Sequence, residues 1–155
     1  MGLMGTELGV IFNRLRTLGT KSIWFKVFAD KELSKMILDM VQQDQLMKQG
    51  VDEDGDIIGE YSEYTEMLNP AKEAGSHYTL FDTGAFYKSM RIIVLNDSFV
   101  IDAEPEKIDE DGRKTNLFEE YGEGIIGLTK KSKQKLSIEI KKRFIKEVNK
   151  YLFGN

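Results

Sequence analysis

The segment DEDGDIIGEYSE carries acidic side chains at the spacing of a calcium-binding loop. Carboxylates stand at the first, third, fifth and twelfth positions, which supply oxygen ligands in an EF-hand: Asp52, Asp54, Asp56 and Glu63. An EF-hand also requires glycine at its sixth position and an apolar residue at its eighth, but Ile57 and Gly59 stand there. We therefore predict an acidic β-hairpin turn at Asp54-Gly55, without a metal site.

Groups that commonly serve in catalysis are scarce in this sequence. His77 is the only histidine, and the chain contains no cysteine. A Ser-His-Asp relay would have one possible base, and a zinc site would need carboxylates for every other ligand. Several aromatic residues could line a pocket, although their spacing is more typical of a core: Tyr61, Tyr64, Tyr78, Phe81, Phe86 and Tyr87. The sequence predicts no catalytic residue, no cofactor site and no metal site, and hence a protein that is not an enzyme.

The segment YTLFDTGAFYKSM combines a carboxylate, hydroxyl groups and a glycine. Its triplet Asp82-Thr83-Gly84 also occurs at the catalytic aspartate of aspartic proteases, where apolar strands flank it; here the helix-like AFYKSM follows. Aspartate and threonine commonly accept hydrogen bonds from the free amides at the start of a helix. We expect Asp82 or Thr83 to cap a short helix from Gly84 to Met90, which makes these polar residues structural.

The elements that must position these residues fit within one domain. The chain has 155 residues, of which 41% are hydrophobic, enough for one core. We predict a single domain over residues 1–155, formed by an N-terminal helical arm (1–19) and an α+β body (20–155). In the arm, Leu8, Ile11 and Leu15 recur at helical spacing.

The body is expected to begin with helix and continue with strands. An apolar face runs along residues 22–47, and Asp30 is placed to cap a break within this helical segment. Two β-branched runs, at 91–95 and 99–103, favour an antiparallel hairpin. We expect Ile93 and Ile101 on this hairpin to lie in the core.

The last part of the chain is expected to be mainly helical. Residues 104–116 have the charged composition of a loop, and Leu117–Tyr121 can form one helical turn. A long C-terminal helix then begins at Thr129, with apolar residues at a uniform spacing of four: Leu136, Ile140, Phe144, Val148 and Leu152. The predicted fold class is α+β, with helices packed on a small antiparallel β-sheet.

Charge is unevenly distributed along the chain. The formal net charge is -4, yet the last helix is strongly basic and includes Lys141, Lys142 and Arg143. Three interpretations remain open: contact with nucleic acid, head-to-tail association with an acidic neighbour, or a solvated helix face. No apolar run approaches the length of a membrane span, and no secretory leader is visible, so no membrane partner is expected.

Three motifs follow one another along the chain: IIGEYSEYT, then KEAGSHYTLFDTGAFYKSM, then RIIVLNDSFVIDAE. This order of motifs resembles phage virion-morphogenesis and tail-completion proteins. The continuation LFEEYGEGIIGLT and the long helix are similar to small proteins from the structural gene blocks of phages of gut anaerobes. In longer-known members a segment with proline and arginine follows the sheet, and YGEGIIGLT stands in its place, which leaves the position of the ring open.

The resemblance implies an α+β subunit without catalysis or cofactor that assembles into a homo-oligomeric ring. The ring would belong to the neck, at the head-tail joint or the top of the tail, and contact portal or connector and tail proteins. The protein would then occur in the virion, and in the host cytoplasm during assembly. The candidate subunit contacts are Leu8, Ile11 and Leu15 on the arm, and Lys141, Lys142 and Arg143 on the last helix. The alternative function is a nucleic-acid-binding module that uses the basic C-terminal helix.

Overall fold

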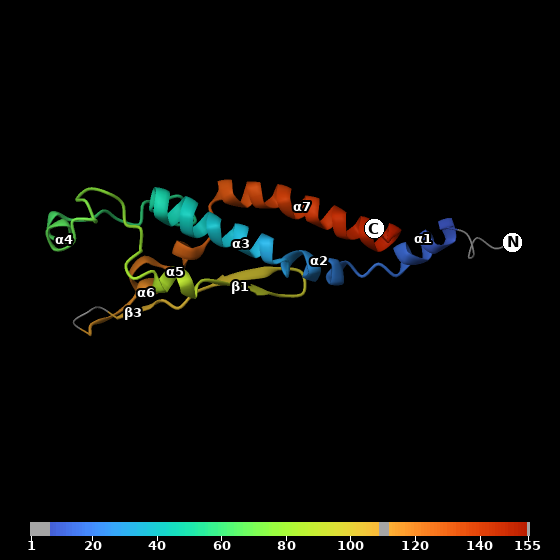
Figure 1. The fold of residues 1–155 in the computed structure, drawn as a ribbon, viewed down its shortest axis with the longest axis horizontal. Coiled ribbons are helices and arrows are strands. Elements are labelled where there is room, and N and C mark those ends of the chain that lie inside the picture. The colour runs from blue at the N-terminus through green and yellow to red at the C-terminus, as the bar shows by residue number, and fades with distance from the viewer. Residues whose placement is uncertain (1–6, 109–111, 155) are drawn as a thin grey trace.

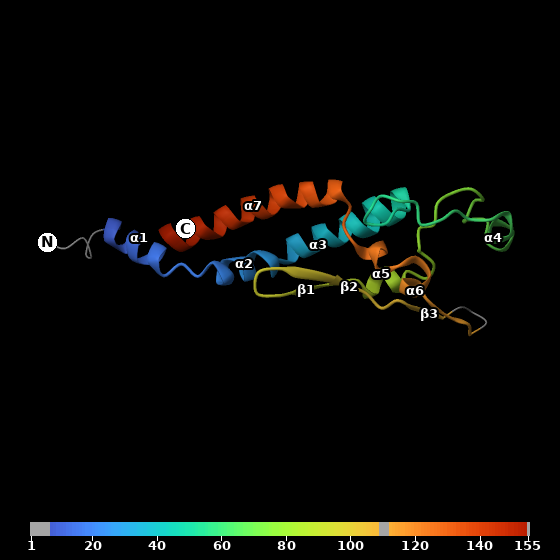
Figure 2. The ribbon, with the colours of Figure 1, turned by 180° about the vertical axis from the view of Figure 1, so that it is seen from behind.

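The computed structural model describes residues 7–108 and 112–154, which form an elongated molecule (Figures 1 and 2). The helices are α1 (Glu7–Arg16), α2 (Thr20–Phe28), α3 (Lys31–Asp39), a π-helix (Met40–Met47), α4 (Glu63–Leu68), α5 (Ala85–Ser89), α6 (Leu117–Tyr121), a 3-10 helix (Glu123–Ile126) and α7 (Lys130–Phe153). The strands are β1 (Arg91–Val94), β2 (Phe99–Asp102), β3 (Glu106–Ile108) and β4 (Lys114–Asn116). The predicted α+β class is confirmed. The strands of the described residues form two separate antiparallel pairs, β1-β2 and β3-β4.

The helices α2 and α3 and the π-helix form one line, along which α7 runs in the opposite direction (Figures 1 and 2). The Trp24 ring of α2 stacks on Phe144 of α7 with 4.2 Å between ring centroids. Asp30 caps the break between α2 and α3 as predicted: at the start of α3, its side chain accepts hydrogen bonds from the amides of Glu32 and Leu33. The same carboxylate lies 2.8 Å from the Arg143 guanidinium, so this break also ties the line to α7.

The helix α7 follows its predicted boundaries closely. The Thr129 hydroxyl caps it by accepting a hydrogen bond from the Ser132 amide at 3.2 Å, and Gly154 ends it in the left-handed conformation. The five residues at a spacing of four all face the core, two of them buried and three packed against it: Leu136 and Leu152, and Ile140, Phe144 and Val148. A long helix with a mainly polar sequence is therefore held by one narrow apolar stripe.

The π-helix was not predicted and places a polar side chain in the core. Gln45 is buried, and its amide group is satisfied on both sides. Its Nε2 donates to the carbonyl of Gly127 at 2.7 Å, and its Oε1 accepts from the amide of Thr129 at 2.9 Å. The end of the first helical line is thereby joined to the start of α7.

The predicted β1-β2 hairpin is present, but one of its core assignments was wrong. In the register, Ile92 pairs with Ile101, and both pack against the core. Ile93 points to the opposite face, where it is 41% exposed. Side chains alternate along a strand, so inward placement of Ile92 turns Ile93 outward. The hairpin packs along α2 and α3 (Figures 1 and 2), where the ring centroids of Phe99 and Phe28 lie 5.4 Å apart.

Two other segments differ from expectation. Residues 104–116, predicted as a charged loop, contain the antiparallel pair β3-β4. The acidic segment forms a turn closed by a single bridge between Val51 and Ile57, without longer strands. Within it, Asp52 Oδ1 accepts hydrogen bonds from two backbone amides, those of Asp54 and Asp56, at 3.0 Å each. This carboxylate therefore stabilises the turn.

Truncation of a core side chain and of an exposed side chain of the hairpin should lower the free energy of unfolding by different amounts. Ile37 is 1% exposed within the core cluster, so Ile37→Ala is expected to lower the free energy of unfolding by about 2 to 5 kcal/mol. Ile93→Ala, on the exposed face of the hairpin, should cost less than about 1 kcal/mol. Urea denaturation of both variants measures the difference. Equal costs would show that the hairpin is packed on both faces.

Candidate functional site

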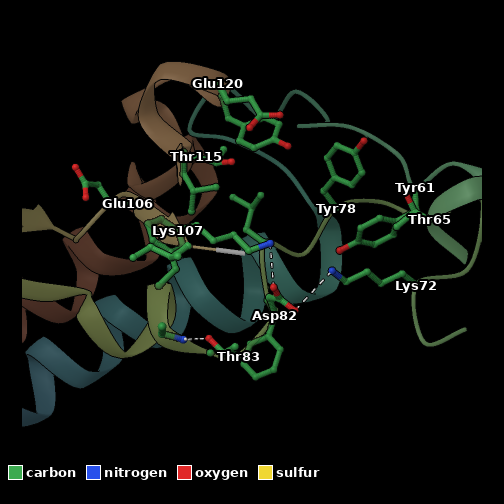
Figure 3. A pocket seen from close by; sticks show the side chains of 18 residues that line it. Tyr61, Thr65, Lys72, Tyr78, Asp82, Thr83, Glu106, Lys107, Thr115 and Glu120 are labelled. Carbon is green, nitrogen blue, oxygen red and sulfur yellow. Dashed lines mark hydrogen bonds and ion pairs between the residues drawn. The ribbon is translucent and has the colours of Figure 1, made fainter. Parts of the chain in front are cut away.

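A pocket of about 540 Å³ lies between the segment around α4 and the end of the body formed by α5, α6 and the β3-β4 pair (Figure 3). Tyr61, Thr65 and Lys72 line it from the side of α4. The opposite wall comes from YTLFDTGAF, β3, β4 and α6. The segment singled out in the sequence therefore lines a cavity.

The backbone of this segment turns sharply at two positions. Leu80 has φ of 54°, in the left-handed region that a bulky side chain rarely adopts. Gly84 has φ of 79°, and a Cβ built there would lie 3.2 Å from the Phe81 ring. Tyr87 stabilises the turn, because its hydroxyl donates a hydrogen bond to the Thr79 carbonyl at 2.5 Å. Strain of this kind persists only where surrounding contacts hold it.

The N-cap of the short helix is Gly84, so neither of the side chains predicted to cap it, Asp82 or Thr83, stands at the N-cap position. Thr83 Oγ1 accepts a hydrogen bond from the amide of Ala85 at 3.3 Å. Asp82, by contrast, turns into the pocket (Figure 3). Its carboxylate lies 2.9 Å from Lys107 Nζ and 3.9 Å from Lys72 Nζ. Asp82 is thus the centre of a lysine-carboxylate-lysine group and does not cap the helix.

The ionisation of the pocket is fixed by these contacts. The hydrogen bond from Lys107 lowers the pKa of Asp82; partial burial opposes this, and the charge of Lys72 adds to it. Burial raises the pKa of Tyr121, and Glu120 raises it further by a hydrogen bond and by its charge. At neutral pH, Asp82 is a carboxylate and Tyr121 a neutral phenol. Neither group exchanges a proton readily near neutrality, as general acid-base catalysis would require.

Aromatic rings form the rest of the wall. The rings of Tyr61 and Tyr78 lie 4.8 Å apart, and Tyr121 meets Tyr78 edge-on at 6.0 Å. Lys72 Nζ lies 5.6 Å from the centroid of Tyr61. Close packing of Tyr78 depends on Gly59, because a Cβ at that position would lie 2.4 Å from the ring.

The prediction that the aromatic residues are core residues was only partly correct. Phe86 and Tyr87 are buried, and Tyr61, Tyr78, Phe81 and Phe86 line the pocket. Tyr64 lies exposed on α4. The lysines that complete the site lie far apart in the sequence, one in a loop and one on β3, so no local pattern marked them.

Within residues 7–108 and 112–154, no group of three or more potential ligands among histidine, aspartate and glutamate could hold a metal ion. His77 serves a structural purpose: its Nε2 lies 3.0 Å from the Met47 carbonyl, and its ring fills the space beside Gly50. None of the helices that the structure describes is both long enough and apolar enough to cross a membrane.

The arm residues predicted to contact a neighbour lie on α1, which rests against its own chain. Arg14 Nη1 donates to the Leu152 carbonyl at 2.7 Å, and the Thr17 and Tyr151 hydroxyl groups lie 3.2 Å apart. Ile11 is half-buried. The side chains of Leu8 and Leu15 fall outside the described part of the structure.

Of the basic residues predicted as subunit contacts, Arg143 is engaged within the chain. Its guanidinium pairs with Asp30 and Glu139, each at 2.8 Å, and lies 3.7 Å from Glu32. Burial lowers the pKa of Arg143, but these carboxylates outweigh that effect and raise it. Arg143 thus makes its ion pairs within the chain, whereas Lys141 and Lys142 are exposed.

Comparisons with protein-family models, with curated proteins and with solved structures find no match to this chain.

Ion pairing of Asp82 predicts a pH-dependent contribution to stability. The pKa of Asp82 is lowered in the folded chain from an ordinary value of 3.8, so its stabilisation is present above pH 3.8 and is lost as the pH falls below that value. Asp82→Asn should lower stability by less than about 1 kcal/mol at pH 6, because the pair is partly exposed. Thermal unfolding of wild type and variant between pH 3 and pH 7 should show the two curves converging at low pH.

A serine variant at position 82 distinguishes an ion-pairing role of Asp82 from a helix-capping role. Asp82→Ser removes the charge but keeps a group that can cap a helix, so it should behave as Asp82→Asn does. If the serine variant had wild-type stability at pH 6, Asp82 would stabilise the protein as a helix cap and not through its ion pairs.

Proposed function

We propose that this protein is a structural subunit of a phage virion, which forms a homo-oligomeric ring in the neck or at the top of the tail. The observation that carries this proposal is the contrast between the two ends of the elongated molecule. The end at α4 exposes apolar side chains in an acidic segment, and the far half of α7 exposes apolar side chains among lysines. The order of motifs that resembles tail-completion proteins supports the same class.

Exposed apolar side chains at both ends favour assembly. Tyr64, Met67 and Leu68 on α4 are between 66% and 71% exposed. On α7, Ile145 and Phe153 are 59% and 55% exposed. Clusters of this kind on a soluble surface mark contact sites more often than scattered single residues do.

Unlike ends favour a head-to-tail arrangement. A two-fold dimer that pairs one end of the molecule with the same end of its copy places acidic against acidic or basic against basic, which is repulsive. A contact between the acidic end of one copy and the basic end of the next pairs opposite charges. Repetition of this contact closes a ring when the rotation between neighbouring copies is a whole fraction of 360°. Portal or connector and tail proteins are the proposed neighbours of this ring, in the virion and, during assembly, in the host cytoplasm.

The pocket fits a binding or joining role better than a catalytic one. Its central carboxylate, Asp82, is already paired with Lys72 and Lys107 of the same chain. The Tyr121 phenol stays protonated at neutral pH, because burial and Glu120 raise its pKa. We therefore propose no catalytic activity and no cofactor.

The exposed lysines of α7 also favour a second candidate, a nucleic-acid-binding module. Lys141, Lys142 and Lys146 are exposed along this helix. Lysines that neutralise phosphates give a binding constant that falls steeply with salt concentration. The net charge of -4 for the whole chain opposes such binding.

Assembly is expected to depend on protein concentration and on salt. The protein should be a monomer or weak oligomer in dilute solution and a closed ring at high concentration, because unlike charges steer the copies together. Added salt should shift the equilibrium toward monomer, since screening shortens the range of charge attraction. Light scattering across a concentration series and electron microscopy of the concentrated protein measure these states. A two-fold dimer as the only assembly would contradict the proposal.

Duplex DNA should bind weakly at physiological salt. Titration of a fluorescent duplex, with wild type and with Lys141→Gln and Lys142→Gln combined, tests the second candidate. Binding in the micromolar range or tighter that weakens steeply with salt, and weakens further in the variant, would favour the nucleic-acid role.

A further inference from the structure

The helix α4 projects from the molecule with no buried residue of its own. Its segment leaves and rejoins the body at a narrow neck, where the Tyr61 amide donates to the Ser76 carbonyl and the Tyr78 amide to the Gly59 carbonyl. Tyr64, Met67 and Leu68 lie at i, i+3 and i+4, which places them on one face of the helix. An ordered helix that exposes this face lacks a packing partner within the described chain.

A shallow groove of about 550 Å³ lies on the far half of α7. It is lined by Lys142, Ile145, Lys146, Asn149, Lys150 and Phe153, which recur on one side of the helix. Ile145 and Phe153 supply an apolar floor, and the three lysines line its sides. This α7 groove lies toward the end of the molecule opposite α4 (Figures 1 and 2).

The α4 segment and the α7 groove carry opposite charges, and both expose apolar side chains. The α4 segment, residues 60–73, carries Glu60, Glu63, Glu66 and Glu73 against the single basic residue Lys72. The residues that line the α7 groove include three lysines and no carboxylate. Apolar side chains on both sides can pack at the centre while opposite charges surround them, which is the usual layout of a specific interface.

We infer that α4 of one copy docks into the α7 groove of a second copy. This contact rests on the proposed ring and names the surfaces that form it. Because the two surfaces lie at opposite ends, the contact joins head to tail and leaves an unused α4 and an unused groove at the two ends of every open chain.

The size of α4 determines the strength of the contact. A stable interface buries roughly 1,200 to 2,000 Å² and engages about 20 to 30 residues on each side. A helix of six residues supplies only part of that area. The pairwise contact is therefore weak, and only the closed ring, in which every copy makes it twice, is stable at moderate concentration.

Disulfide trapping tests the contact directly, since the chain has no cysteine. Single variants Met67→Cys and Ile145→Cys are mixed in equal amounts and oxidised mildly at a concentration where light scattering shows assembly. We expect the mixed dimer to exceed either homodimer at least fivefold, and a chain carrying both substitutions to form a ladder of covalent oligomers. Both positions are exposed, so neither change should disturb folding.

Charge exchange supplies an independent readout. The pair Lys146→Glu and Lys150→Glu should weaken association roughly tenfold or more, because like charges then meet across the contact. The pair Glu60→Lys and Glu63→Lys should do the same, and a mixture of the two variants should recover association. Lys130→Glu and Lys131→Glu, at the other end of α7, form the matched control and should leave association unchanged.

The outcomes separate this contact from the proposed function. Trapping of Met67→Cys with itself, or rings that survive both charge reversals, would overturn the α4-groove contact and leave the ring proposal standing. The absence of any assembly at high concentration in wild-type protein would overturn both.

Discussion

The buried side-chain amide of Gln45 joins the two halves of the chain. An unpaired amide in the core would cost about 1 to 3 kcal/mol, so its position is tightly constrained by the two backbone groups that satisfy it. Those groups, at Gly127 and Thr129, lie immediately before α7. The start of α7 is thereby set against the end of the first helical line, and the antiparallel contacts of Asp30 with Arg143 and then of Trp24 with Phe144 follow along it.

This antiparallel alignment also explains why the two ends of the molecule differ chemically. One stripe of α7 is used in the core, which leaves the basic outer side exposed. The acidic segment 60–73 extends beyond the end of the core at which α7 begins (Figure 1). The acidic segment and the basic side of α7, which are separate in the sequence, are therefore also separate in space. A chain with the same composition but a parallel helix pair would bring the acidic and basic segments to one end.

The helices and first hairpin could be predicted because their signals are local. Asp30 and Thr129 cap helices through amides two or three residues away, and the apolar spacing of α7 is readable directly. The choice between Ile92 and Ile93 depends on which face the neighbouring helices cover, which alternation alone does not decide. The β3-β4 pair has charged side chains and is held by backbone pairing, so composition indicated a loop. Asp82 was misassigned because its partners come from distant segments.

The narrow neck below α4 separates two kinds of evolutionary constraint. The segment between Tyr61 and Ser76 is closed by backbone hydrogen bonds, and its helix contributes no buried side chain to the body. Substitutions, and even changes in length, within such a closed loop have little effect on the stability of the core. Constraint on the sequence of this loop therefore comes from the contacts that it makes, and constraint on the helical framework comes from packing.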